Sequence, residues 1–166
     1  MKKIILAGGC FWGVEAYFSR VKGVLTTQVG YTDAEGKNPT YHDVCNNSGH
    51  VEAVYVTYDE SVTPLTKILE HFFRIINPTE VNRQGNDIGV QYRSAIFYFD
   101  IEDYDLINHF IEELQKNYTK KIYTYVKPAG IFYDAEDYHQ DYLDKNPMGY
   151  CHINLHLLKK EEAKEK

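Results

Sequence analysis

Residues 4–13, Ile-Ile-Leu-Ala-Gly-Gly-Cys-Phe-Trp-Gly, decide how the N-terminal part of this chain folds. The four apolar residues predict a short strand, the glycine pair a tight turn, and the amphipathic residues 14–21 a helix. Cys10 is therefore expected at or just before the first helical turn, where unpaired backbone N–H groups and the positive end of the helix dipole favour an anion. A thiolate is such an anion, so we expect the cysteine pKa to fall below its usual value of roughly 8.5.

Two interpretations of Cys10 are open at this point. In the first, it is a nucleophilic or redox cysteine, and the adjacent rings of Phe11 and Trp12 form an apolar wall beside the sulfur. In the second, it is a buried core cysteine that happens to lie in a turn. Position and flanking residues favour the reactive cysteine, because reactive thiols occupy such anion-stabilising surroundings.

The composition narrows the class of protein. A chain of 166 residues with 43% hydrophobic residues suits one domain with its own core. The net charge is −6 and no basic stripe alternates with aromatic residues, so nucleic acid is not expected as a partner. Three cysteines, an odd number, favour a reducing compartment over a secreted disulfide framework. No apolar run approaches the roughly 18 residues of a membrane span. We therefore expect a cytoplasmic protein that binds no membrane.

Residue patterns along the chain predict an α+β fold. Strands are expected at residues 3–7, 24–31, 51–58 and 94–99, and helices at residues 14–21 and 65–76. This β-α-β-β-α-β order is that of the ferredoxin-like split β-α-β core, a sheet with helices on one face. A helix at residues 101–118, a strand at residues 122–126, a short helix at residues 135–143 and a long C-terminal coil would follow. We expect one domain over residues 1–158 and a charged, frayed tail over residues 159–166.

Two long polar loops, residues 32–49 and 79–91, are expected to hold the side chains that surround Cys10, because loops of that length in a compact domain are usually functional. Glu52 follows the first loop among apolar neighbours, and partial desolvation there would raise its pKa and make it a proton donor. Taken alone, a solvent-facing glutamate on an edge strand is the simpler interpretation. Tyr41, Asp87 and Tyr92, each taken alone, are better explained as ordinary loop residues than as catalytic ones.

The other two cysteines differ in character. Cys151 lies in a Gly-containing coil near the C-terminus, where a mobile segment could bring a second thiol to an oxidised Cys10. Cys45 lies late in the first loop, and we interpret it as a small buried apolar residue. No Cys-x-x-Cys pair occurs and no two cysteines have metal-ligand spacing, so no metal site is expected.

A series of motifs in this order resembles peptide methionine sulfoxide reductase A. The resemblance covers nearly the whole chain, and eight or nine motifs in sequence are far more specific than any one of them. The motifs are Gly9-Cys10-Phe11-Trp12-Gly13, Gly30-Tyr31-Thr32, Asn38-Pro39-Thr40-Tyr41, Val44-Cys45, Gly49-His50-Val51-Glu52, Arg83-Gln84-Gly85-Asn86-Asp87-Ile88-Gly89, Gln91-Tyr92-Arg93-Ser94-Ala95-Ile96, Phe132-Tyr133-x-Ala135-Glu136-x-x-His139-Gln140 and Asn146-Pro147-x-Gly149-Tyr150-Cys151.

The resemblance implies a catalytic role for five residues. Cys10 would be the nucleophile that attacks the sulfoxide sulfur, and Glu52 the acid that protonates the sulfoxide oxygen. Tyr41 and Tyr92 would donate hydroxyl hydrogen bonds to that oxygen, and Asp87 would organise the polar network of the site. Such donors stabilise charge as the S–O bond reorganises. The resemblance also implies a ferredoxin-like α/β core, in agreement with the predicted order of elements.

The resemblance further implies how the substrate is held and the enzyme recycled. Phe11 and Trp12 would pack around the substrate methyl group, and the S epimer of methionine sulfoxide, free or in a peptide, would be reduced. Cys151 would resolve the Cys10 sulfenic acid as a disulfide, which thioredoxin would reduce. No cofactor is needed. Cys45 matches a cysteine that is not used in turnover, and the sequence after Cys151 offers no further cysteine for recycling.

Two other classes of protein remain as alternatives. The first is another cysteine-based redox enzyme, such as a thiol peroxidase that acts on hydroperoxides. The second is a non-enzymatic domain of the same fold that binds a metal or a small ligand, against which the lack of a Cys-x-x-Cys pair argues. Competition between methionine sulfoxide and hydroperoxide for Cys10, and metal analysis of the purified protein, would separate them.

Overall fold

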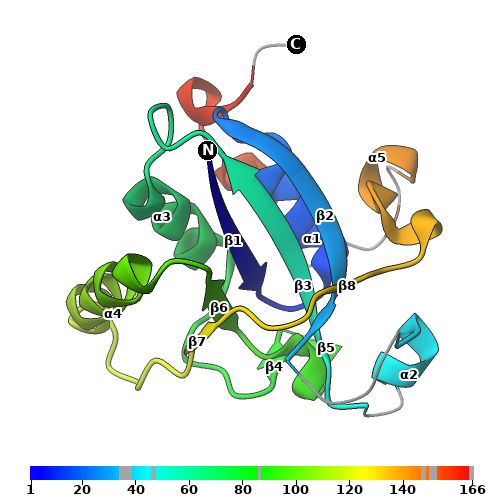
Figure 1. Cartoon of the computed structure of the whole chain (residues 1–166). Coiled ribbons are helices and arrows are strands. Elements are labelled where there is room, and N and C mark those ends of the chain that lie inside the picture. Colours follow the sequence, from blue (N-terminus) through cyan, green and yellow to red (C-terminus); the bar gives the residue numbers. More distant parts are fainter. Residues whose placement is uncertain (34–38, 46–47, 86, 147–148, 150–152, 165–166) are drawn as a thin grey trace.

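The computed structural model describes residues 1–33, 39–45, 48–85, 87–146, 149 and 153–164. Within these residues, six strands form one sheet in the order β7-β6-β1-β3-β2-β8, and β4 and β5 form a separate two-stranded hairpin (Figure 1). The elements are β1 (Lys2–Ala7), α1 (Phe11–Phe18), β2 (Val24–Thr32), α2 (Tyr41–Cys45), β3 (Val51–Tyr58), α3 (Leu65–Ile75), β4 (Arg83–Gln84), β5 (Asp87–Ile88), β6 (Ala95–Tyr98), α4 (Ile101–Gln115), β7 (Tyr125–Pro128), β8 (Tyr133–Asp134) and α5 (Tyr142–Lys145).

The order of the central strands confirms the ferredoxin-like core. β1 pairs antiparallel with both β3 and β6, and β3 pairs antiparallel with β2. The helices α1 and α3 follow β1 and β3, as the split β-α-β arrangement requires. Outside this core, β7 pairs parallel with β6 at one edge, and β8 pairs antiparallel with β2 at the other.

The central strands β1, β3 and β6 are buried on both faces over most of their length, which explains why they are almost continuously apolar. On one face, Leu6 of β1 and Val54 of β3 pack with Phe72 of α3 in the larger core cluster. On the other face, a smaller cluster that includes Ile5 and Phe97 is covered by residues such as Tyr55, Ala129 and Phe132. β1 and β3 therefore lie between two apolar layers, and their side chains are shielded from water on either side.

Several predicted boundaries differ from the structure. The helix expected at residues 14–21 begins earlier, at Phe11, and the first long loop contains the short helix α2. A short helix predicted at residues 135–143 is wrong. Those residues form a 3-10 turn at Asp137–His139, and α5 begins only after Asp141, whose φ of +53° is left-handed. A left-handed residue breaks a continuous helix.

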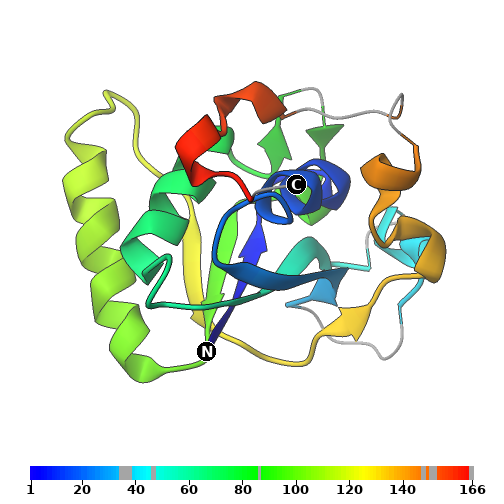
Figure 2. The ribbon, with the colours of Figure 1, turned by 90° about the horizontal axis from the view of Figure 1, so that it is seen from above.

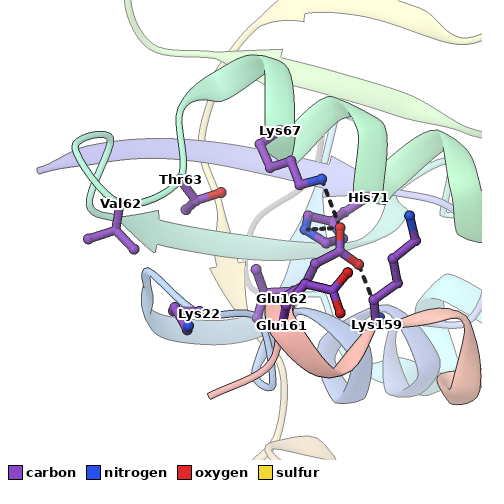
Figure 3. A pocket seen from close by; sticks show the side chains of 9 residues that line it. Lys22, Val62, Thr63, Lys67, His71, Lys159, Glu161 and Glu162 are labelled. Atoms are coloured by element: carbon purple, nitrogen blue, oxygen red, sulfur yellow. Dashed lines mark hydrogen bonds and ion pairs between the residues drawn. The ribbon is translucent and has the colours of Figure 1, made fainter. Parts of the chain in front are cut away.

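The segment after Lys159 also differs from the expected frayed tail. Residues Lys160–Glu162 form a 3-10 turn that lies against α1 and α3 (Figure 2, red). Glu162 is only 9% exposed, and its carboxylate accepts from both Arg74 Nη1 and Nη2, at 2.7 and 3.1 Å. Lys67 Nζ lies 2.8 Å from the same carboxylate (Figure 3). Glu162 is thus buried and paired with two cations of α3, so this charge-rich segment packs against the fold.

Candidate active site

Cys10 lies between β1 and α1, where the glycine turn was predicted. It occupies the N-cap position of α1 with φ −61° and ψ 124°, and its side chain is 4% exposed. Gly9 has a left-handed φ of +88°, which favours glycine. A Cβ atom built on Gly8 would lie 2.5 Å from Ile76 Cγ2, so the chain between β1 and Cys10 must pass against the end of α3 without a side chain. The turn thus holds the sulfur at the start of the helix.

Glu52 is fully buried, and the solvent-facing interpretation of this residue is therefore wrong. It lies on β3, a central strand, two residues before Val54, which pairs with Leu6, and so beside the turn that follows β1. Its Oε1 accepts a hydrogen bond from the backbone N–H of Phe11 at 3.3 Å. Burial raises the pKa of Glu52 to about 8; the Phe11 N–H acts in the opposite direction and the negative charge of Asp87 adds to the rise.

The two carboxyl oxygens of Glu52 differ in their hydrogen bonding. Its Oε2 is buried and has no hydrogen-bond partner among the residues that the structure describes. With a pKa of about 8, the carboxyl group is largely protonated at neutral pH. Because Oε1 accepts the Phe11 N–H, the proton belongs on Oε2. The site therefore contains a buried O–H group that is available to donate.

Tyr41 and Tyr92 come from two different elements, and the charge of Glu52 acts on both. Tyr41 is the first residue of α2, and Tyr92 ends a 3-10 turn at Val90–Tyr92. Burial raises the pKa of each phenol, and the negative charges of Glu52 and Cys10 raise it further. The charge of Asp87, in β5, also raises the pKa of Tyr92. The structure thus brings Cys10, Glu52, both tyrosines and Asp87 into one electrostatic neighbourhood.

The two aromatic residues after Cys10 differ in exposure. Phe11 is fully buried and packs with Tyr31, Tyr41 and His139. Trp12 is half-buried, and its indole N–H donates to His139 Nδ1 at 3.0 Å. The ring of Tyr142 in α5 stacks on Trp12, with 3.9 Å between ring centroids, so Phe11, Trp12, His139 and Tyr142 together form an aromatic wall.

From the sequence, His139 and Tyr142 were not assigned to the site. His139 belongs to a motif quoted above but was given no role, and Tyr142 was not singled out at all. His139 is 1% exposed, and burial lowers its pKa, against a smaller opposing effect of Glu136. A neutral imidazole that accepts at Nδ1 carries its proton on Nε2. The Trp12 hydrogen bond therefore fixes the tautomer of His139.

The expectation for Cys45 is wrong. It ends α2 as an exposed residue, because the helix turns Val44 toward the core instead. Partial desolvation of the sulfur still raises the pKa of this thiol, while a hydrogen bond from the Tyr41 hydroxyl acts in the opposite direction. Cys151, the expected resolving cysteine, lies outside the residues that the structure describes.

Among the described residues, no group of three or more His, Cys, Asp or Glu side chains could hold a metal ion. A cavity of about 260 Å³ lies elsewhere, between α3 and the C-terminal segment, and is lined by residues such as Thr63, Lys67 and Glu162 (Figure 3). None of the predicted site residues lines it. No helix in the described part of the chain is long and apolar enough to cross a membrane.

The sequence matches the family "Peptide methionine sulfoxide reductase" over residues 2–166. The chain belongs to this family. It is 56% identical to the peptide methionine sulfoxide reductase MsrA of Clostridium tetani over 156 residues, which are 93% of this chain and 95% of the relative. The MsrA of Clostridium botulinum is 54% identical, over 93% of this chain and 99% of the relative. As the resemblance implied, the chain is a peptide-methionine (S)-S-oxide reductase.

Solved structures similar to this chain include a methionine sulfoxide reductase A. Reduced Mxr1 from Saccharomyces cerevisiae superposes with a TM-score of 0.85 at 38% identity, covering 92% of this chain and 91% of Mxr1. Methionine sulfoxide reductase A of Corynebacterium diphtheriae superposes with a TM-score of 0.82 at 35% identity, covering 90% and 77%. Mxr1 in complex with Trx2 is also similar, with a TM-score of 0.60 at 29% identity, covering 85% and 84%.

Proposed function

We propose that Cys10 is the nucleophile of this reductase. Its thiolate attacks the sulfoxide sulfur, the oxygen receives a proton and passes to the Cys10 sulfur, and methionine leaves. The substrate sulfur is thereby reduced by two electrons and Cys10 is oxidised to a sulfenic acid. Support comes from the N-cap position at the start of α1, where the helix dipole favours a thiolate.

The observation that carries the proposal is the protonated, buried carboxyl group of Glu52. A sulfoxide oxygen is a poor leaving group until it is protonated, so the reaction needs an acid beside the thiolate. With a pKa of about 8, Glu52 keeps its proton at neutral pH, and Oε2 has no other partner among the described residues. A carboxyl group with an ordinary pKa would already have lost that proton.

The two tyrosines supply the remaining hydrogen bonds to the oxygen in this proposal. Their phenols carry a proton at neutral pH, and burial raises their pKa values further above that range, so each can donate. Preorganised donors aimed at developing charge are an effective form of transition-state stabilisation. Asp87 supports the raised pKa of Glu52 through its charge, and Phe11 and Trp12 form the apolar side of the pocket around the substrate methyl group.

Recycling is proposed to pass through Cys151. Its thiol condenses with the Cys10 sulfenic acid, which releases water and forms a Cys10–Cys151 disulfide. A dithiol carrier then reduces this disulfide by thiol–disulfide exchange and restores both thiols. We take the carrier to be thioredoxin, because the related Mxr1 has been crystallised with Trx2. The proposed location is the cytoplasm, where such carriers keep thiols reduced.

The test is single-turnover reduction of the separated R and S epimers of a methionine sulfoxide peptide by the pre-reduced protein, with thiols counted before and after. We expect reduction of the S epimer alone with loss of two thiols, and in Cys151→Ser one turnover without a disulfide. Cys10→Ser should be inactive. Turnover by Cys10→Ser, or no reduction of either epimer, would overturn the proposal, and consumption of hydroperoxide in preference would favour a peroxidase.

A further inference from the structure

Arg93 follows Tyr92 directly, and its side chain joins three segments of the active site. Its Nη1 donates to the carbonyl oxygens of Val90, at 2.7 Å, and Gly49, at 3.3 Å. Its Nη2 donates to the carbonyl oxygen of Asp33 at 3.2 Å and to the Asp33 carboxylate at 2.9 Å. The Arg93 side chain is only 12% exposed, so these hydrogen bonds are made with little competition from water.

Two of the three carbonyl groups mark the ends of the connection between β2 and β3. Thr32 and Val51 form the last pair of that strand ladder, and Asp33 and Gly49 lie just beyond it. Both have left-handed backbones, with φ of +65° and +91°, so their carbonyl groups turn away from the ladder. Arg93 supplies the donors that the neighbouring strand no longer offers. The connection that it closes contains α2, and therefore Tyr41.

The third carbonyl group belongs to the turn that carries the other tyrosine. Val90 begins the 3-10 turn that ends at Tyr92, and its oxygen also accepts the backbone N–H of Arg93 at 3.3 Å. The guanidinium group thus ties this turn to the start of β3, the strand that carries Glu52. One side chain thus contacts the turn that ends at Tyr92 and both ends of the connection that contains Tyr41, one of them two residues before the strand that carries Glu52.

We propose that Arg93 is a positioning residue of the reductase. Its guanidinium group fixes the bases of the two segments that carry Tyr41 and Tyr92, and so sets where both hydroxyl groups meet the sulfoxide oxygen. The inference rests on the proposed roles of these tyrosines. Lysine cannot replace arginine here, because a single ammonium group lacks the planar fork that reaches three carbonyl groups at once.

The test is a comparison of Arg93→Lys in two backgrounds, measured as the single-turnover rate with the S epimer. In the otherwise unchanged protein we expect the rate to fall about tenfold or more, because small misplacements of catalytic groups are costly. In the Tyr41→Phe/Tyr92→Phe background, which is already slower by about 10²-fold, the same change should cost less than about twofold. Equal falls in both backgrounds, or no fall in either, would overturn the inference.

Two matched variants separate this role from a general loss of structure. Arg83→Lys changes a guanidinium group that also donates two hydrogen bonds to a carbonyl oxygen, that of Gly85, but in β4 with its side chain exposed. Lys127→Met removes the second cation of Asp33 and leaves the Arg93 fork in place. Both should keep the rate within about twofold of the unchanged protein. A fall in Lys127→Met as large as in Arg93→Lys would assign the effect to the Asp33 charge and overturn the positioning role.

Chemical rescue keeps the inference testable if Arg93→Lys is poorly folded. In Arg93→Ala, guanidinium at concentrations too low to denature should restore a substantial part of the lost rate, whereas methylammonium should not, because it lacks the fork. Rescue by neither ion, with a far-UV spectrum like that of the unchanged protein, would contradict the inference. The proposed function is judged separately, since the thiol count and Cys10→Ser do not depend on Arg93.

Discussion

The carboxyl group of Glu52 shows which properties of one side chain can be predicted from its neighbours. Its apolar flanks predicted a raised pKa, and burial does raise it to about 8. Whether the side chain is buried at all depended on a non-local fact, namely that β3 lies between β1 and β2 and is not an edge strand. Cys45 was expected to be buried and is exposed. Its exposure could not be predicted, because α2 is too short to leave a clear helical periodicity in the sequence.

We expect Glu52→Gln to slow the single-turnover reduction by about 10²–10⁴, the usual contribution of a general acid. The same variant should lose a pH dependence of stability. Between the ordinary value of 4.5 and about 8, the folded protein keeps a proton on Glu52 that the unfolded chain releases. Stability therefore falls as pH rises through this window, by about 1.4 kcal/mol per unit from this group. Denaturant titrations at several pH values measure the difference between the two proteins.

Glu15→Gln is the matched control for Glu52→Gln. The Glu15 carboxyl group is 2% exposed, and burial raises its pKa to about 7, but it bonds the Asp141 backbone and Thr27 instead of facing the site. This variant should also flatten the pH dependence, over a window that ends near pH 7, while its single-turnover rate stays within about twofold. A rate for Glu52→Gln equal to that of Glu15→Gln would remove Glu52 as the acid.

The strand–turn–helix unit at the N-terminus was predictable because its signals are local. Apolar residues, two glycines and a helical period follow one another within 18 residues, and β1 and α1 form where those signals lie. The region around α5 was not predictable in this way. Contacts with residues distant in sequence hold this region: the Gln140 side chain, for example, hydrogen-bonds both the N–H and the carbonyl group of Val29 in β2. Such contacts, with a left-handed Asp141, override a local preference for helix.

Packing of the glycine turn against the end of α3 leads to a prediction at this scale. Gly8→Ala should lower the free energy of unfolding by about 1–3 kcal/mol, because its Cβ would meet Ile76 Cγ2 at 2.5 Å and Phe72 at 3.1 Å. Gly130→Ala is the control, since a Cβ there has no neighbour within 4 Å among the described residues, and it should change stability by less than about 0.5 kcal/mol. Equal midpoints in urea for the two variants would refute this account of the turn.

Across the molecule, the C-terminal segment returns to the chain just after α1. Ala163 forms an isolated β-bridge with Val21, and the Lys22 N–H donates to the Glu162 carbonyl oxygen. Glu162 itself joins this segment to Arg74 of α3. The charge-rich composition of this segment gave no sign of that closure, because the partner of Glu162 lies 88 residues away in sequence. The composition of one segment cannot indicate an ion pair with a second segment that is distant in sequence.

Glu162→Gln should therefore destabilise the protein by about 1.5–3 kcal/mol at pH 7, the range for hydrogen bonds to charged groups. Hydrogen bonds from Arg74 hold the pKa of Glu162 well below its ordinary value of 4.5. The stabilisation is complete above that value and lost as pH falls, so the two proteins should converge in acid. Glu161→Gln, an exposed neighbour, should match the unchanged protein in thermal unfolding at every pH. A constant gap down to low pH would contradict the ion-pair explanation.

The chain contains one tryptophan, and the structure places it beside the proposed active site, stacked on Tyr142 and hydrogen-bonded to His139. All tryptophan emission from this protein therefore originates at one known position. A change of emission on adding substrate or product must arise beside Cys10, without the averaging that several tryptophans would cause. The native sequence thus carries its own optical reporter, with which binding, turnover and recycling can be followed in real time without a label.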